Sequence, residues 1–127
     1  MEAFARPFTE AHLAVLRRGV DPADPTVLTA RHSGGFLLLT RHRLMVTRRT
    51  RVLHRLRLHL SANLRHLSNI SWNADARQHA LTVNLTAIDG VRERFVLLLA
   101  DADEVWRAEA LFRGVMRQHT KDFARAA

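Results

Sequence analysis

From residue 26 to residue 99 the chain alternates apolar and polar side chains over most of its length, and short turn signals interrupt the alternation. Side chains two residues apart lie on one face of a β-strand, so this pattern predicts strands with one face in a core. The turns are short, which predicts antiparallel neighbours. A chain of 127 residues of which 47% are hydrophobic is sufficient for one domain with a sizeable core.

The clearest hairpin joins Phe36–Thr40 to Arg43–Arg49, with Arg41 and His42 as its loop. Both faces of this hairpin are apolar, so a further element must cover the outer one. A short helix from Phe8 to Arg18, or a second subunit, is expected there. A two-residue loop predicts three cross-strand pairs: Leu37 with Val46, Leu38 with Met45, and Leu39 with Leu44.

A second hairpin is indicated by Asp89-Gly90 between two alternating segments. A two-residue loop would mix apolar and charged residues on one face. A three-residue loop from Ile88 to Gly90, with Gly90 in the left-handed region, keeps one face apolar. That longer loop predicts the pairs Val83 with Phe95 and Leu81 with Leu97.

The remaining strands are less uniform. Thr26–Arg31 is the first, and Leu64–Trp72 reads as a bulged or interrupted strand because its apolar residues recur every third position. Trp72–Asp75 is expected to turn the chain. Val52–Leu60 alternates cleanly, which predicts a half-buried strand with a cationic outer surface. Val52, His54, Leu56, Leu58 and Leu60 share the buried face, and Leu53, Arg55, Arg57 and His59 share the outer one.

A helix from Asp101 to His119 closes the predicted domain. Asp101 and Glu104 resemble a capping box, and apolar residues recur at helical spacing behind them. The expected organisation is an N-terminal helix and linker over residues 1–25, one domain over residues 26–119, and a tail over residues 120–127.

Positive charge is concentrated in the middle of the chain. The formal net charge is +8, and nine arginines but no acidic residue lie between Pro25 and Ala74. Positive charge gathered in one segment indicates an anionic partner, such as nucleic acid, lipid headgroups or an acidic protein. The alternative is that these arginines only cover a solvent-exposed face of the sheet. The candidate binding residues are Arg41, Arg43, Arg48, Arg49, Arg55, Arg57 and His59.

Several functional classes find no support in the sequence. There is no cysteine, no glycine-rich phosphate loop and no nucleophile-elbow context, and the eight histidines lack metal-ligand spacing. We therefore expect no enzyme activity, no cofactor and no metal. Separately, we expect Trp72 and Trp106 to be core aromatics. The longest apolar run is too short to cross a bilayer and the N-terminus lacks a signal-peptide core, which favours a cytoplasmic location with or without peripheral membrane attachment.

The segment Gly35-Phe36-Leu37-Leu38-Leu39-Thr40-Arg41-His42-Arg43-Leu44-Met45-Val46-Thr47 resembles a hairpin of the pleckstrin-homology (PH) superfold, specifically of small bacterial PH-like domains. The resemblance implies a mainly β fold, a seven-stranded antiparallel barrel or sandwich capped by a C-terminal helix, which serves as a binding scaffold. Phosphoinositide-binding PH domains carry a basic motif across a long first loop. Here that loop, Ser33-Gly34-Gly35, is short and Phe36–Leu39 contains no basic residue.

The resemblance and the charge together predict a non-catalytic binding or adaptor module. Its basic face would bind an acidic protein or an anionic membrane lipid. The alternative is a nucleic-acid-binding protein that contacts phosphates through the same arginines. Exposed apolar surface could also support a homodimer, through the N-terminal helix or the Phe36–Thr47 hairpin.

Overall fold

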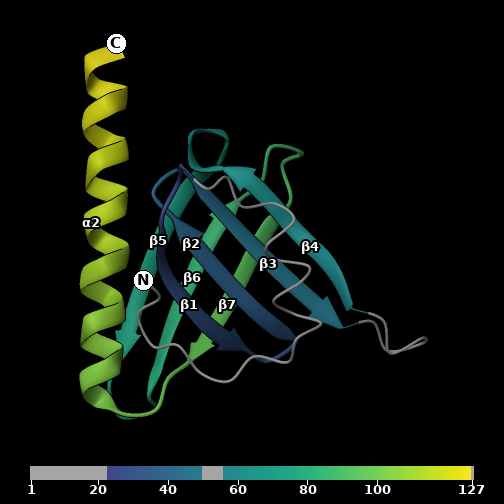
Figure 1. Cartoon of the computed structure of the whole chain (residues 1–127), viewed down its shortest axis with the longest axis vertical. Helices are drawn as coiled ribbons and strands as arrows, with labels where there is room; N and C mark the ends of the chain where they lie inside the picture. Colours follow the sequence, from purple (N-terminus) through teal and green to yellow (C-terminus); the bar gives the residue numbers. More distant parts are fainter. Residues whose placement is uncertain (1–22, 50–55, 127) are drawn as a thin grey trace.

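The computed structural model of the chain describes residues 23–49 and 56–126, and within them the fold is mainly β (Figure 1). Seven antiparallel strands precede one C-terminal helix, and a short 3₁₀-helix lies between the fourth and fifth strands. The elements are β1 (Thr26–His32), β2 (Gly35–Thr40), β3 (Arg43–Arg49), β4 (Leu56–Asn63), η1 (Leu64–His66), β5 (Ser68–Asp75), β6 (Ala80–Thr86), β7 (Arg92–Leu98) and α2 (Ala102–Ala126). The expected N-terminal helix, Phe8–Arg18, lies outside the described residues.

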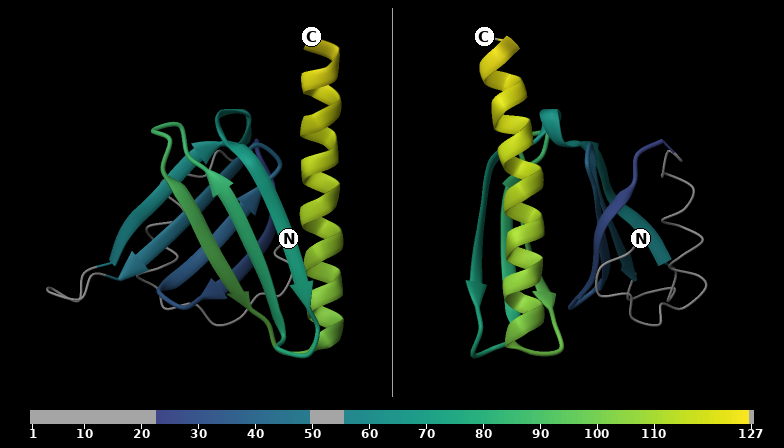
Figure 2. Two further views of the ribbon diagram at one scale, coloured as in Figure 1. Left: turned by 180° about the vertical axis from the view of Figure 1, so that it is seen from behind. Right: turned by 60° about the vertical axis from the view of Figure 1, so that its left-hand side comes forward.

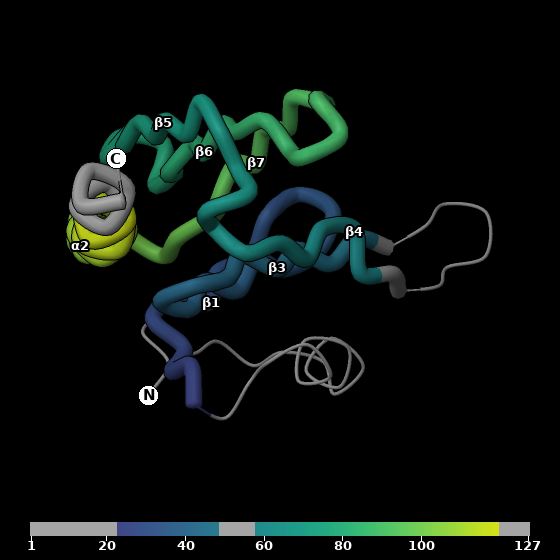
Figure 3. Tube along the Cα trace, turned by 90° about the horizontal axis from the view of Figure 1, so that it is seen from above, coloured from purple at the N-terminus to yellow at the C-terminus, as the bar shows by residue number. Residues whose placement is uncertain are grey.

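The strands form one sheet in the order β4-β3-β2-β1-β7-β6-β5. The sheet is folded into two layers, with β1 to β4 in one and β5 to β7 in the other (Figures 2 and 3). Among the described residues, two pairs join the layers through the sheet, Arg31 with Leu98 and His32 with Leu97. The expectation of a seven-stranded antiparallel β fold with a C-terminal helix is therefore confirmed.

Both hairpin registers agree with the sequence predictions. In the first hairpin Leu37 pairs with Val46, and the two neighbouring pairs are also as expected. In the second, Val83 pairs with Phe95. Its loop spans three residues, because the amide of Ala87 donates to the carbonyl of Val91 at 2.9 Å. Gly90 closes that loop with a φ of 86°, in the left-handed region that favours glycine.

The predicted alternation of Val52–Leu60 is wrong at its C-terminal end, because β4 contains a bulge. Val46 pairs with Leu60, but the next residue of β3 pairs with Leu58, so His59 is an extra residue on β4. Leu58 and Leu60 consequently face opposite sides: Leu58 is 41% exposed, whereas Leu60 packs against the core. Residues 50–55 lie outside the described part of the chain.

The strand expected at Leu64–Trp72 is interrupted as predicted, but its boundaries differ. Residues 64–66 form η1, and β5 then continues to Asp75, so the expected turn at Trp72–Asp75 is wrong. The chain turns after Asp75 instead, where its carboxylate accepts the amides of Arg77 at 3.1 Å and Gln78 at 3.3 Å. A side chain that satisfies two turn amides fixes the turn at this position.

Helix α2 begins as predicted and ends later. The carboxylate of Asp101 accepts the amide of Glu104 at 2.8 Å, and the Glu104 carboxylate accepts the amide of Ala100 at 2.8 Å. The helix then runs past the expected end at His119 to Ala126, because neither glycine nor proline occurs between these two residues. Trp106 is 54% exposed, so the prediction of a core aromatic is wrong at that position.

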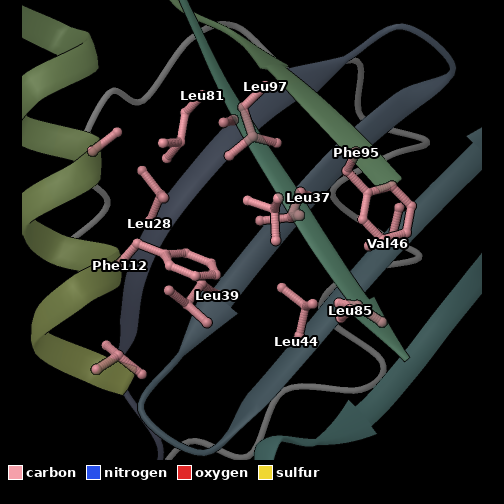
Figure 4. Packing of buried hydrophobic residues seen from close by; sticks show 14 of the residues in the cluster. Leu28, Leu37, Leu39, Leu44, Val46, Leu81, Leu85, Phe95, Leu97 and Phe112 are labelled. Carbon is pink, nitrogen blue, oxygen red and sulfur yellow. The ribbon is translucent and has the colours of Figure 1, made fainter. Parts of the chain in front are cut away.

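The main core lies between the two layers and beneath α2 (Figure 4). Leu37, Val46 and Phe95 contribute from the sheet, and Phe112 contributes from the helix. A second, smaller buried cluster lies on the opposite face of β2 and β3 and consists of Phe36, Leu38 and Met45. Both faces of this hairpin are therefore covered.

Candidate functional site

Three turns meet at one end of the molecule, the upper end in Figure 1. The β2–β3 turn contacts η1 through a hydrogen bond from the amide of Leu64 to the carbonyl of His42 at 2.7 Å. η1 is followed by Ser68, which pairs with Thr86, and Thr86 pairs with Arg92 across the β6–β7 turn. We call this surface the turn end, formed by residues 41–43, 63–67 and 86–92.

The β2–β3 turn is held by a buried carboxylate. Asp24 is 7% exposed, and its oxygens accept the hydroxyl of Thr40 and the amide of Arg41, the latter at 3.1 Å. The Thr40 hydroxyl oxygen in turn accepts the amides of His42 at 3.2 Å and Arg43 at 2.9 Å. The connected hydrogen bonds fix the backbone from which the turn's cationic side chains project. Sequence reasoning assigned no role to Asp24.

The turn end combines exposed cations with exposed apolar side chains. Its exposed basic residues are Arg41, His42, Arg65, His66 and Arg92. At the tip of the β6–β7 turn Ile88 is 79% exposed and Val91 is 51% exposed. The carboxylate at that tip, Asp89, accepts the amide of Val91 at 3.0 Å and so serves the turn itself. Arg65, Arg92 and the apolar tip were not among the predicted site residues, because only the register of β5 with β6 brings them to this end.

The predicted site residues do not form one patch among the described side chains. Arg41 and Arg43 lie at the turn end, where the Arg43 guanidinium donates to the Ser61 hydroxyl at 3.1 Å. Arg48 lies five residues further along β3, about 17 Å away, beside the β1–β2 turn. The backbones of Arg49 and Arg57 belong to β3 and β4, while Arg55 lies outside the described residues.

His59 was predicted to lie on the cationic outer face, and that prediction is wrong. Its Nε2 lies 3.1 and 3.2 Å from the two carboxylate oxygens of Glu93 on β7. Its ring meets the ring of Phe95 edge-on, with 6.2 Å between centroids. The β4 bulge is the reason, since the extra residue turns His59 toward the other layer. His59 therefore links the two layers and is engaged with a carboxylate.

A second histidine is buried beside this pair. The Nδ1 of His32 accepts the amide of Gly34 at 3.2 Å, and its Nε2 lies 2.9 Å from the carbonyl of Thr47. Burial lowers the pKa of His32, against the hydrogen bond to the carbonyl of Thr47, which raises it, and the positive charge of Arg48 lowers this pKa further. Both ring nitrogens are occupied, so His32 holds the β1–β2 turn and is not free to bind a ligand.

Within residues 23–49 and 56–126, no three His, Asp or Glu side chains gather in an arrangement that could hold a metal ion. The described helix is also not long and apolar enough to cross a membrane. No protein-family model matches the sequence, and no curated protein matches it.

Proposed function

We propose that this protein is a non-catalytic, PH-like binding module that attaches reversibly to an anionic membrane surface through its turn end. The two-layered antiparallel sheet with a C-terminal helix against it supports the PH-like part of the proposal. The observation that carries the membrane part is the composition of the turn end, where an apolar tip projects among exposed arginines.

An exposed apolar tip with neighbouring cations suits the interface of a bilayer. The tip, Ile88 with Val91, would enter the headgroup region, while Arg41, Arg65 and Arg92 would meet lipid phosphates. An arginine near an anionic surface contributes about 1 kcal/mol, and burial of an isoleucine side chain contributes about 1.5–3 kcal/mol. Three such arginines and one isoleucine together contribute about 5 kcal/mol of binding free energy, which corresponds to a dissociation constant between micromolar and millimolar. Binding of this strength is reversible.

The test is sedimentation with vesicles of phosphatidylcholine containing phosphatidylserine. Arg41→Gln/Arg65→Gln removes two exposed cations from the turn end, and Ile88→Ser/Val91→Ser removes the apolar tip. Both double variants should sediment less than the wild type. The matched control Arg31→Gln/Arg77→Gln removes the same charge from exposed positions away from the turn end and should sediment like the wild type.

Three results would overturn the membrane assignment. If the turn-end and control arginine variants lose vesicle sedimentation equally, the net charge of the protein alone would explain its attraction to the vesicles. Unchanged sedimentation of the Ile88→Ser/Val91→Ser variant, with an acidic protein captured through Arg41 and Arg65, would favour an acidic protein partner. Tighter binding to duplex or single-stranded nucleic acid than to vesicles, with a steep fall in affinity as salt rises, would favour a nucleic-acid-binding protein.

A further inference from the structure

A pocket of about 330 Å³ opens between η1, the start of β5 and the C-terminal half of α2. Its apolar lining comes from all three elements: Leu64, Leu67, Ile70, Trp72 and Met116. Leu64, Leu67 and Met116 are all less than 8% exposed, so they belong to the packed core as well as to the pocket. The apolar floor is therefore formed before any ligand arrives.

Trp72 is fixed in this floor by two contacts with α2. Its Nε1 donates to a carboxylate oxygen of Glu109 at 2.8 Å, and its ring meets Phe112 edge-on, with centroids 5.1 Å apart. The other carboxylate oxygen of Glu109 lies 3.3 Å from the guanidinium of Arg113. Glu109 is thus engaged on both oxygens, and a ligand would not have to displace a mobile aromatic ring.

The polar rim of the pocket carries positive charge. Arg117 lines it and is exposed, and Arg65 stands exposed on the adjoining η1. His119 also lines the pocket, and its Nε2 lies 2.7 Å from the carbonyl of Arg41. None of the lining residues that the structure describes is acidic. A ligand with an apolar anchor and an adjacent negative charge would match both the floor and the rim.

The backbone beside the pocket is the edge of the sheet. β5 is the terminal strand in the order of the described strands, so one side of its backbone has no neighbouring strand. The pairing of β5 with β6 also shifts between Ser68 and Ser71, and Asn69 has a φ of 50° within that shift. An extended chain can add hydrogen bonds to an open strand edge, and a neighbouring pocket can select one of its side chains.

We propose that this pocket binds an extended acidic peptide, which seats one large apolar side chain on the Trp72 floor, places a carboxylate near Arg117 and runs along the free edge of β5. An acyl chain would fill the floor but could not use the strand edge. A pocket of this volume is at the small end for a ligand site, which suits a single anchoring side chain. The inference goes beyond the proposed membrane contact, since it uses the α2 side of η1 and not the β6–β7 tip.

The experiment starts from a random heptapeptide library displayed on phage and selected against the full chain. The selected peptides should share one large apolar position with Asp or Glu nearby. Synthetic, fluorescently labelled copies are then titrated by fluorescence anisotropy. Ser68→Trp places a large ring at the pocket and should weaken peptide binding by at least about tenfold. Arg117→Glu should weaken it by a similar factor, and the loss should shrink as salt rises.

Matched controls occupy exposed positions in the β5–β6 turn, away from the pocket. Gln78→Trp introduces the same ring and Arg77→Glu makes the same change of charge, and both should leave peptide affinity unchanged. A series of peptides with single N-methylated amides tests the strand edge. Methylation should abolish binding at alternate residues only, because alternate amides of an added strand point toward its neighbour.

The proposal fails if the selected peptides bind the Ser68→Trp protein as tightly as the wild type, or if selection yields no shared apolar position. It also fails, in favour of an acyl ligand, if dodecanoate binds, Ser68→Trp removes that binding, and peptides do not compete. Vesicle sedimentation of Ser68→Trp should equal that of the wild type. Weaker peptide binding by Ser68→Trp with unchanged vesicle sedimentation is therefore the expected result, and a loss of vesicle binding by Ile88→Ser/Val91→Ser with unchanged peptide binding would show that the two proposals stand or fall separately.

Discussion

Removal of the buried carboxylate of Asp24 should destabilise the whole domain, although the residue lies just before the first strand. In the native state its two oxygens accept the Thr40 hydroxyl and the Arg41 amide. Asp24→Ala leaves both donors buried or half-buried without that acceptor. It also releases the Thr40 hydroxyl, on which the amides of His42 and Arg43 depend.

The size of the effect follows from these contacts. A hydrogen bond to a charged group contributes about 1.5–3 kcal/mol, and the loss of two such bonds predicts a fall of about 3–6 kcal/mol in the free energy of unfolding. Domains of this size are stable by only about 5–15 kcal/mol. A loss of about 3 kcal/mol would lower Tm by about 12–24 °C. Asp24→Asn keeps an oxygen that can accept the Arg41 amide, so it should lower the free energy of unfolding less than Asp24→Ala does.

Urea unfolding followed by tryptophan fluorescence, and thermal unfolding followed by circular dichroism, measure this loss. Asp103→Ala is the matched control, since it removes an exposed carboxylate from the first turn of α2 and should cost less than about 1 kcal/mol. If Asp24→Ala unfolds within about 1 kcal/mol of the wild type, the carboxylate does not hold the turn and the reasoning is refuted.

Four further outcomes are expected. The pKa of His32 is lower in the folded than in the unfolded state, so the unfolded state binds more protons and the free energy of unfolding should fall as the pH drops below about 6.5. His32→Gln should weaken this dependence of the free energy of unfolding on pH, as measured by urea titrations. Gly35→Ala should prevent folding or sharply lower Tm, because its Cβ would stand 2.3 Å from the carbonyl oxygen of Thr47, whereas Gly114→Ala meets open space and should be tolerated. Asp101→Ala should cost about 1 kcal/mol in urea unfolding through loss of the α2 cap, and an unchanged midpoint would contradict that cap. Deletion of residues 1–20 should cause aggregation or a new oligomeric state in light scattering, whereas a soluble deletion protein of unchanged mass would show that this segment is dispensable.

The parts of the fold that the sequence predicted are those controlled by local spacing. The loop length that separates two apolar segments determines their register, which is why Leu37 with Val46 and Val83 with Phe95 were found without a structure. The cap of α2 was also local, because Asp101 lies three residues before the amide that it accepts.

The parts that failed depend on a single inserted residue or on packing between distant segments. The bulge at His59 leaves no mark in the alternation of the sequence, yet it places Leu58 on the face opposite to the one expected. The position of Glu93, on the other layer, could not be inferred from spacing. Only Arg41 and Arg43 of the turn end were predicted, for the same reason. Arg65 comes to this end because the amide of Leu64 donates to the carbonyl of His42, a contact between segments more than 20 residues apart.

The narrow junction between β1 and β7 has a consequence for how the chain folds. Every other pairing of the described strands joins two that are consecutive in the chain, so both layers are built from short-range hairpins, which form quickly. The two pairs between β1 and β7 join opposite ends of the domain and carry most of the loop-closure entropy. We therefore expect the pairing of β1 with β7 to be the step in which topology limits the folding rate. Helix α2 packs against β1, β5 and β6, so its full set of contacts requires that this junction has formed.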